Sequence, residues 1–146
     1  MYKKPIESHL LKPSLDPESR TSSANGLGVD TQGYGNALAI CHLGAHDRTT
    51  GDETIEFQVS ESDDNSTFTD ITGATTGAIG NVVPNATSGN VYLINIDLMK
   101  SGRKRYLRIE TVAAGTTPVD LCSGSILLSN PRFAAPVTQD DTVISV

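Results

Sequence analysis

The most regular feature of this chain is the alternation of apolar and polar residues over residues 54–60 (TIEFQVS). Ile55, Phe57 and Val59 point to one side of an extended chain, and the polar residues between them point to the other. This alternation predicts a strand with one face in a core. Further strands are predicted, from alternation or from short apolar runs, over residues 37–43, 67–71, 91–98, 103–112 and 119–129.

Short polar turns separate these segments, as in ESDDN at 61–65 and AAGTTP at 113–118. Residues 73–89 read as a loop with one short strand at most. Seven or eight strands without a helical period predict an all-β fold, an antiparallel β-sandwich that is jelly-roll-like or immunoglobulin-like. The residues expected in its core are Leu38, Ile40, Ile55, Phe57, Val59, Phe68, Ile94, Ile96, Leu107 and Ile109.

The two ends of the chain differ from its middle. Three prolines and a polar stretch over residues 1–28 predict an extended N-terminal arm, and Pro131 and Pro136 predict a C-terminal arm over 131–146. The sandwich domain is then expected at 29–130. We expect residues 1–20 to add little to its fold and much to assembly, because long irregular segments commonly order on a partner.

Length and charge limit the classes of function. The 146 residues suit one domain, since domains usually hold about 100–200 residues. Seventeen acidic and eleven basic residues give a net charge of −6, which disfavours nucleic acid as a partner. A run of about 18 apolar residues is missing, so no membrane-spanning helix is expected. The start of the chain lacks the apolar core of a secretory signal, and we expect synthesis in the cytoplasm.

Two cysteines leave two readings open. Cys41 and Cys122 both fall in apolar stretches, which is typical of buried reduced thiols. A disulfide between neighbouring strands is the alternative, and it is rare in proteins that are not secreted.

We find no catalytic or metal-binding motif in the sequence. His42 and His46 have the i, i+4 spacing of a helical zinc site, but Gly44 lies between them in a strand-like context and the glutamate of HExxH is missing. The acidic residues at 63–64 suit a hairpin turn better than a calcium loop. We therefore expect neither an enzyme nor a cofactor or metal.

The basic segment RKRYLR at 103–108 has two readings. A strand with such charges is usually a solvated face that pairs with nearby carboxylates, or an edge strand guarded by charge. Alternatively, it contacts an acidic neighbouring subunit.

Several phrases of the chain resemble small head proteins of tailed bacteriophages. They are GVDTQGY at 28–34, the hairpin sequence EFQVSESDDNSTFTDI at 56–71, RYLR at 105–108 and NPR at 130–132. The resemblance covers residues 28–132, with Asn65 standing where glycine is usual. It implies a capsid decoration (cement) protein, a β-sandwich that binds the outer surface of the phage head and stabilises contacts between major capsid subunits.

That reading carries expectations about partners. The expected partners are the major capsid protein and further copies of the chain. A homotrimer is favoured because it suits local three-fold sites, and a dimer is the alternative. The expected location is the outer surface of the virion capsid. The alternatives are a tail-associated module and a receptor- or carbohydrate-binding β-sandwich. The candidate subunit contacts are Lys3, Lys4, Leu10, Leu11, Arg103, Arg105, Arg132 and Phe133.

Overall fold

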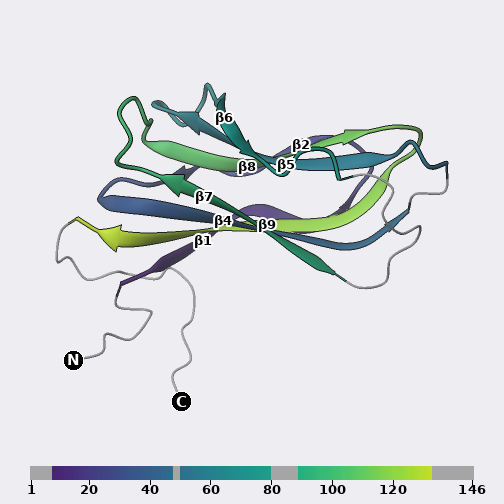
Figure 1. Ribbon diagram of the computed structural model, residues 1–146, viewed down its shortest axis with the longest axis horizontal. Helices are drawn as coiled ribbons and strands as arrows, with labels where there is room; N and C mark the ends of the chain where they lie inside the picture. Colours follow the sequence, from purple (N-terminus) through teal and green to yellow (C-terminus); the bar gives the residue numbers. More distant parts are fainter. Residues whose placement is uncertain (1–7, 48–49, 80–88, 133–146) are drawn as a thin grey trace, which may run out of the picture.

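The chain forms a sandwich of two antiparallel sheets (Figure 1) in a computed structural model that describes residues 8–47, 50–79 and 89–132. This confirms the predicted all-β sandwich. Within these residues, no helix is long and apolar enough to cross a membrane. The strands are β1 (Leu10–Arg20), β2 (Ala24–Asn25), β3 (Val29–Asp30), β4 (Tyr34–Asp47), β5 (Thr54–Ser62), β6 (Thr69–Thr75), β7 (Asn90–Asp97), β8 (Tyr106–Ala114) and β9 (Val119–Pro131).

The strand order identifies the type of sandwich. The four-stranded sheet has the order β1-β9-β4-β7, and the five-stranded sheet has the order β2-β8-β5-β6, with β3 also paired to β8. If β2 and β3 count as one interrupted strand, the two orders become 1-8-3-6 and 2-7-4-5, which is the arrangement of a jelly roll. Of the two predicted alternatives, the structure therefore favours the jelly roll over the immunoglobulin fold.

The core lies between the two sheets, where alternate residues of each strand point inward. Seven of the predicted core residues are buried there: Ile55, Phe57, Val59, Ile94, Ile96, Leu107 and Ile109. Phe57 has no exposed surface, and its ring centroid lies 6.1 Å from that of Tyr92. The alternation along β5 predicts Ile55, Phe57 and Val59 in the core correctly, because successive side chains of a strand point to opposite faces of the sheet.

The predicted core positions Leu38 and Ile40 were wrong. Both are half-buried on the outward face of β4, while Ala37, Ala39 and Cys41 are buried between the sheets. The sequence ALAIC is apolar at every position, so its pattern does not show which residues point inward. The small alanines fill the inner side, and the larger side chains are left outside.

Phe68 was also wrongly expected in the core. It is half-buried in the turn between β5 and β6, and the guanidinium carbon of Arg108 lies 4.1 Å from its ring centroid. The ring thus packs against a cation rather than within the core, an arrangement that favours partial exposure of both groups.

The expectation that residues 1–20 add little to the fold is wrong for residues 10–20. Strand β1 pairs with β9 at eight positions, with irregularities between Pro13 and Glu18. Leu15 and Ser14 are buried, and the Ser14 hydroxyl accepts a hydrogen bond from the Ile109 amide of the other sheet at 2.9 Å. Edge strands and bulges tolerate proline, so the two prolines of this segment did not exclude a strand.

At the other end of the chain, β9 continues to Pro131, one residue beyond the predicted limit of the sandwich. The Arg132 amide still donates a hydrogen bond to the Gly33 carbonyl, at 2.7 Å. The remainder of the predicted C-terminal arm, residues 133–146, lies outside the described residues, as do residues 1–7.

Cys41 and Cys122 are free, buried thiols on the neighbouring strands β4 and β9. Cys41 lies opposite Gly124, and Cys122 lies opposite Leu43, so the two cysteines are diagonal neighbours. Diagonal neighbours are about 7–8 Å apart, beyond the usual span of a disulfide. Burial and the nearby Cys122 raise the pKa of Cys41 to about 12, which makes it a poor nucleophile.

Candidate interaction surface

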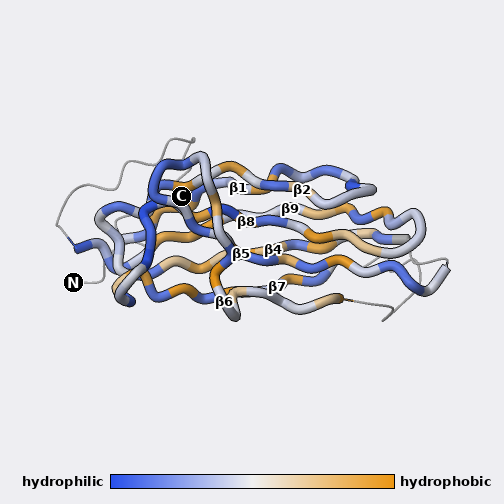
Figure 2. The backbone as a smooth tube through the Cα atoms, turned by 90° about the horizontal axis from the view of Figure 1, so that it is seen from above, coloured by the Kyte–Doolittle hydropathy of each residue, from blue (hydrophilic) through white to orange (hydrophobic). Residues whose placement is uncertain are grey.

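The outward side of the four-stranded sheet carries a second set of apolar side chains. Leu93 and Val91 of β7 stand out most, with 61% and 56% of their surface exposed. Hydrophobic segments recur along β4, β7 and β9 in the hydropathy colouring of Figure 2. We call this surface the outer apolar face and define it as Leu11, Leu38, Ile40, Val91, Leu93 and Leu127.

The strand register brings these side chains together. Leu11 of β1 lies opposite Leu127 of β9, which lies opposite Leu38 of β4. Two residues further along β4, Ile40 lies opposite Leu93 of β7. Directly opposed side chains on one face of a sheet are about 4.5–5.5 Å apart. The face is therefore contiguous across all four strands.

The middle of this sheet surface is uncharged. Apart from Asp97, the outward residues described on three strands are uncharged: Asn36, Leu38, Ile40 and His42 on β4, Val91, Leu93 and Asn95 on β7, and Ser123, Ser125 and Leu127 on β9. Asp97 stands at the end of β7. A contiguous apolar surface without charges is typical of a protein–protein contact.

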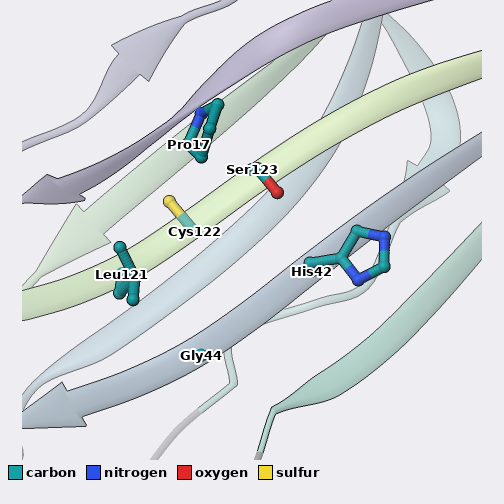
Figure 3. Close-up of a pocket in the computed structure, with 6 residues that line it drawn as sticks. All are labelled: Pro17, His42, Gly44, Leu121, Cys122 and Ser123. Carbon is teal, nitrogen blue, oxygen red and sulfur yellow. The ribbon is translucent and has the colours of Figure 1, made fainter.

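A hollow of about 420 Å³ adjoins the outer apolar face (Figure 3). It lies where β1, β9 and β4 run side by side, near the irregular part of β1. Beside Gly44, the Leu121 side chain comes within 3.3 Å of the position that a Cβ atom would take. The lining residues are Pro17, His42, Gly44, Leu121, Cys122 and Ser123. The mostly apolar lining suits an apolar side chain better than a polar ligand.

The arginines of the basic cluster at 103–108 are paired with carboxylates of the same chain. Arg103 and Glu61 form an ion pair at 2.9 Å, with both side chains largely buried. Arg105 binds both carboxylate oxygens of Asp30, at 3.0 and 2.6 Å. These pairs confirm the reading of the cluster as a charged face that pairs with nearby carboxylates. That Arg103 and Arg105 also contact another subunit stays a prediction.

Glu110 on β8 is a largely buried carboxylate that is held by hydrogen bonds. Burial raises its pKa, but hydrogen bonds from Ser60, Arg108 and Gln58 outweigh that effect and hold the pKa below its usual value. The Arg108 Nε atom lies 2.6 Å from the carboxylate and the Gln58 amide nitrogen 3.2 Å from it. The hydrogen-bond partners of Glu110 therefore stabilise its ionised form, and this carboxylate has a structural role rather than that of a proton donor.

Of the other candidate subunit contacts, Leu11 belongs to the outer apolar face, with 43% of its surface exposed. Its neighbour Leu10 is half-buried and packs against the core. Arg132 is exposed just after β9. Lys3, Lys4 and Phe133 lie outside the described residues. The structure thus brings only Leu11 of this set onto the outer apolar face.

Sequence reasoning missed most of this face. The sequence pattern predicts Leu38 and Ile40 in the core. It predicts strands through Leu127, Val91 and Leu93 but does not show that these side chains point outward. The sequence does contain one signal of this face. The segments ALAICHL and SILL have apolar residues at consecutive positions, so their strands carry apolar side chains on both faces of the sheet. Such strands are usually covered by other parts of a protein on both faces.

The histidines and acidic turns make no metal site in the part of the chain that the structure describes, where no three His, Cys, Asp or Glu residues group together. His42 points outward from β4, and the His46 ring nitrogen Nδ1 lies 3.1 Å from the Gly44 carbonyl oxygen. One carboxylate oxygen of Asp64, Oδ1, accepts three hydrogen bonds within its own turn. Ser62 donates to it at 2.7 Å, and the amides of Ser66 and Thr67 donate at 2.9 and 2.8 Å.

We expect Asp64 to make the β5–β6 turn sensitive to acid. Hydrogen bonds from Thr67, Ser62 and Ser66 lower its pKa from 3.8 to about 2. A carboxylate with a lowered pKa stabilises the folded state above its unfolded pKa, and this contribution is lost as the pH falls toward about 2. Carbon-detected NMR should give a titration midpoint near 2 for Asp64, with faster amide exchange at Ser66 and Thr67 over the same pH range.

The neighbouring Asp63 supplies the matched control, because it is an exposed carboxylate of the same turn. Asp64→Ala should open the turn at neutral pH, as measured by amide exchange, whereas Asp63→Ala should leave it closed. An ordinary midpoint near 3.8 for Asp64 would contradict this account of the turn.

Comparisons with known proteins find similar solved structures and one matching family. The crystal structure of the SPBc2 prophage-derived protein YomS is similar, with 16% identity over 83% of this chain and 95% of that chain and a TM-score of 0.47. The cryo-EM structure of Broad Bean Stain Virus is 10% identical over 91% of this chain and 93% of that chain, with a TM-score of 0.40. No curated protein matches significantly in sequence. The Bbp16 family profile matches residues 20–125, and the chain therefore belongs to the Bbp16 family.

Proposed function

We propose that this chain is a structural protein of a phage particle, a capsid decoration (cement) protein. In this role it binds the outer surface of the head and stabilises contacts between major capsid subunits. It acts through protein contacts, with the major capsid protein and with further copies of itself as a trimer or a dimer. It needs no cofactor and catalyses no reaction.

The observation that carries this proposal is the outer apolar face on a sandwich whose core is already complete. Leu93 and Val91 are more than half exposed, although the strand that bears them buries Ile94 and Ile96 on its other side. Exposed apolar surface of this extent is costly in water unless another protein covers it. A module built for protein contacts fits a virion component better than it fits an enzyme.

The resemblance to small phage head proteins supports the same role. Its phrases coincide with structural turns and strands. In GVDTQGY, Asp30 binds Arg105 of RYLR, so two of these phrases are joined by an ion pair. In the hairpin sequence, Asn65 adopts a left-handed backbone with φ of 57°, which explains how it stands in for glycine. The sequence segments that carry the resemblance therefore form turns and strands of the same sandwich.

The test is to locate the chain on particles of the phage that encodes it. A cryo-EM map should show the sandwich on the outside of the head, in contact with major capsid subunits. Heads lacking the chain should lose their DNA at a lower temperature, and adding purified folded protein should restore the wild-type temperature, whereas heat-unfolded protein should not. Density on the tail would replace the cement role by the tail-associated alternative, and binding to glycans without binding to heads would replace it by a carbohydrate-binding role.

A further inference from the structure

We propose that Asn25 is a site of spontaneous deamidation in this chain, and that the folded sandwich holds the reaction back until β2 opens. Asn25 ends β2, and with Gly26 it makes the single Asn-Gly step of the sequence. An asparagine followed by glycine is especially prone to this reaction, because glycine has no side chain to hinder the attacking nitrogen. The inference concerns the chain itself and does not depend on the proposed function.

The reaction uses only water as a co-reactant. The Gly26 backbone nitrogen loses its proton and attacks the side-chain carbonyl carbon of Asn25, and ammonia leaves as the C–N bond of the side-chain amide breaks. The product is a five-membered succinimide ring. Water then opens the ring at either of its carbonyl carbons, which gives aspartate or isoaspartate, in which the backbone runs through the former side chain. Neither an oxidant nor a reductant is needed.

Strand β2 holds the reacting groups in an unreactive arrangement. The Gly26 amide donates a hydrogen bond to the Ile109 carbonyl of β8 at 2.9 Å, so removing its proton costs this bond. Asn25 pairs with Glu110 in the β ladder. The extended backbone of a strand, with ψ of about +135°, turns the nitrogen of the next residue away from the side chain, whereas ring closure needs the two in contact. Deamidation therefore requires that β2 first leave β8.

Strand β2 is short and lies at an edge. It has two residues and is the last strand in the order of the five-stranded sheet. The Asn25 residue itself is exposed. Short edge segments open locally without unfolding the rest of a protein. The folded chain therefore deamidates in proportion to the small fraction of molecules in which β2 is open.

The fold requires glycine at position 26. A Cβ atom on Gly26 would lie 2.4 Å from the Ser14 carbonyl oxygen and 2.6 Å from the Ile109 carbonyl oxygen. Both are backbone atoms, which cannot turn aside as the end of a flexible side chain can. The close approach of β1 and β8 to residue 26 therefore keeps the reactive step in the chain as long as residue 25 is asparagine.

The product weakens a contact between the two sheets. An isoaspartate at residue 25 adds one backbone atom before Gly26 and shifts Leu27, whose amide donates to the Ser14 carbonyl at 2.5 Å and whose carbonyl accepts from the Ser14 hydroxyl at 2.9 Å. Either product also adds a carboxylate at the position opposite Glu110, and like charges directly opposed on a sheet are destabilising. Deamidation thus converts a transient opening of β2 into a lasting one.

Peptide mapping by mass spectrometry tests the inference on the full chain. The protein is incubated in mildly alkaline buffer, once folded and once unfolded in urea, with heavy-oxygen water so that each hydrolysed ring is labelled. Asn25 should be the first asparagine converted in both samples. Its conversion should be at least about 30-fold slower in the folded chain than in urea, because the reaction waits for β2 to open.

Ser14→Ala tests the dependence on opening. The variant lacks the hydroxyl that bonds Leu27 and Ile109, so β2 should open more often and Asn25 should convert at least about 5-fold faster in the folded chain, with an unchanged rate in urea. Ser125→Ala is the matched control, because Ser125 is half-buried on the outward side of β9. It should leave both rates unchanged. If Ser14→Ala does not fold, the two wild-type rates decide.

Asn25→Ala tests the consequence of the reaction, because it cannot form the ring. After the same incubation this variant should keep slow hydrogen exchange at the amides of Leu27 and Ile109. The deamidated wild-type chain, collected by ion exchange from the folded sample, should exchange these amides at least about tenfold faster.

Four results would overturn the inference: conversion of another asparagine ahead of Asn25, equal rates in the folded and the unfolded chain, equal rates in folded Ser14→Ala and Ser125→Ala, or a deamidated chain whose amides exchange as slowly as those of Asn25→Ala. Each of these concerns the free protein in solution. The proposed function is tested separately by the location of the chain on particles, so either can fail while the other stands.

Discussion

Replacing Phe57 with alanine should cost the fold about 3–5 kcal/mol, the usual range for deleting a buried phenylalanine ring. Phe57 is the largest side chain without exposed surface, and it lies between the sheets in contact with Tyr92. Its backbone is held at both ends, by the Thr76 hydroxyl at 3.1 Å and the Thr76 amide at 2.9 Å. The site therefore cannot collapse onto the missing ring, and urea unfolding should show most of the stability lost.

Phe68 is the matched control for this loss. It carries the same ring, but it is half-buried under Arg108 outside the core. Phe68→Ala should lower the unfolding free energy less than Phe57→Ala does. Equal losses at the two positions would mean that the strand register of β5 is not the one described.

Removing residues 1–20 should abolish cooperative folding rather than leave a stable sandwich. The deletion exposes the edge of β9 along eight paired positions and uncovers the core beside Leu15. It also removes Ser14, whose hydroxyl accepts a hydrogen bond from the Ile109 amide and donates one to the Leu27 carbonyl, both at 2.9 Å. The buried Ile109 amide then loses its partner, at a cost of about 1–3 kcal/mol.

Thermal unfolding followed by circular dichroism measures this effect. The matched control is the removal of residues 1–7 alone, which keeps every described contact of β1 and should preserve a sharp transition. A truncation through Arg20 that melts within a few degrees of the full chain would show that β1 is dispensable for folding.

The sequence was most informative where one face of a strand is buried and the other is wet. The alternation in TIEFQVS located β5 and its core residues, and the Asp- and Asn-rich turn after it was equally clear. Strand β1 was missed because a proline in a sequence counts against a strand. The structure tolerates Pro13 and Pro17 since β1 is an edge strand with an irregular register.

The candidate surface was harder to predict than the fold. Leu38 and Ile40 have the same apolar character as their inward neighbours, so hydropathy alone assigns them to a core. Only the register, with Leu38 beside Leu127 and Ile40 beside Leu93, shows that they form one outward surface. That register depends on pairings between distant segments of the chain, which no local pattern contains.

The irregular course of β1 also limits how the protein aggregates. An exposed edge strand is a template for adding strands from other molecules, which leads to fibres. Pro13 and Pro17 carry no amide hydrogen, and the register of β1 shifts twice between Pro13 and Glu18. An incoming strand therefore meets an interrupted row of donors along this edge. Strand β1 therefore disfavours open-ended growth of the sheet and leaves association to surfaces that close.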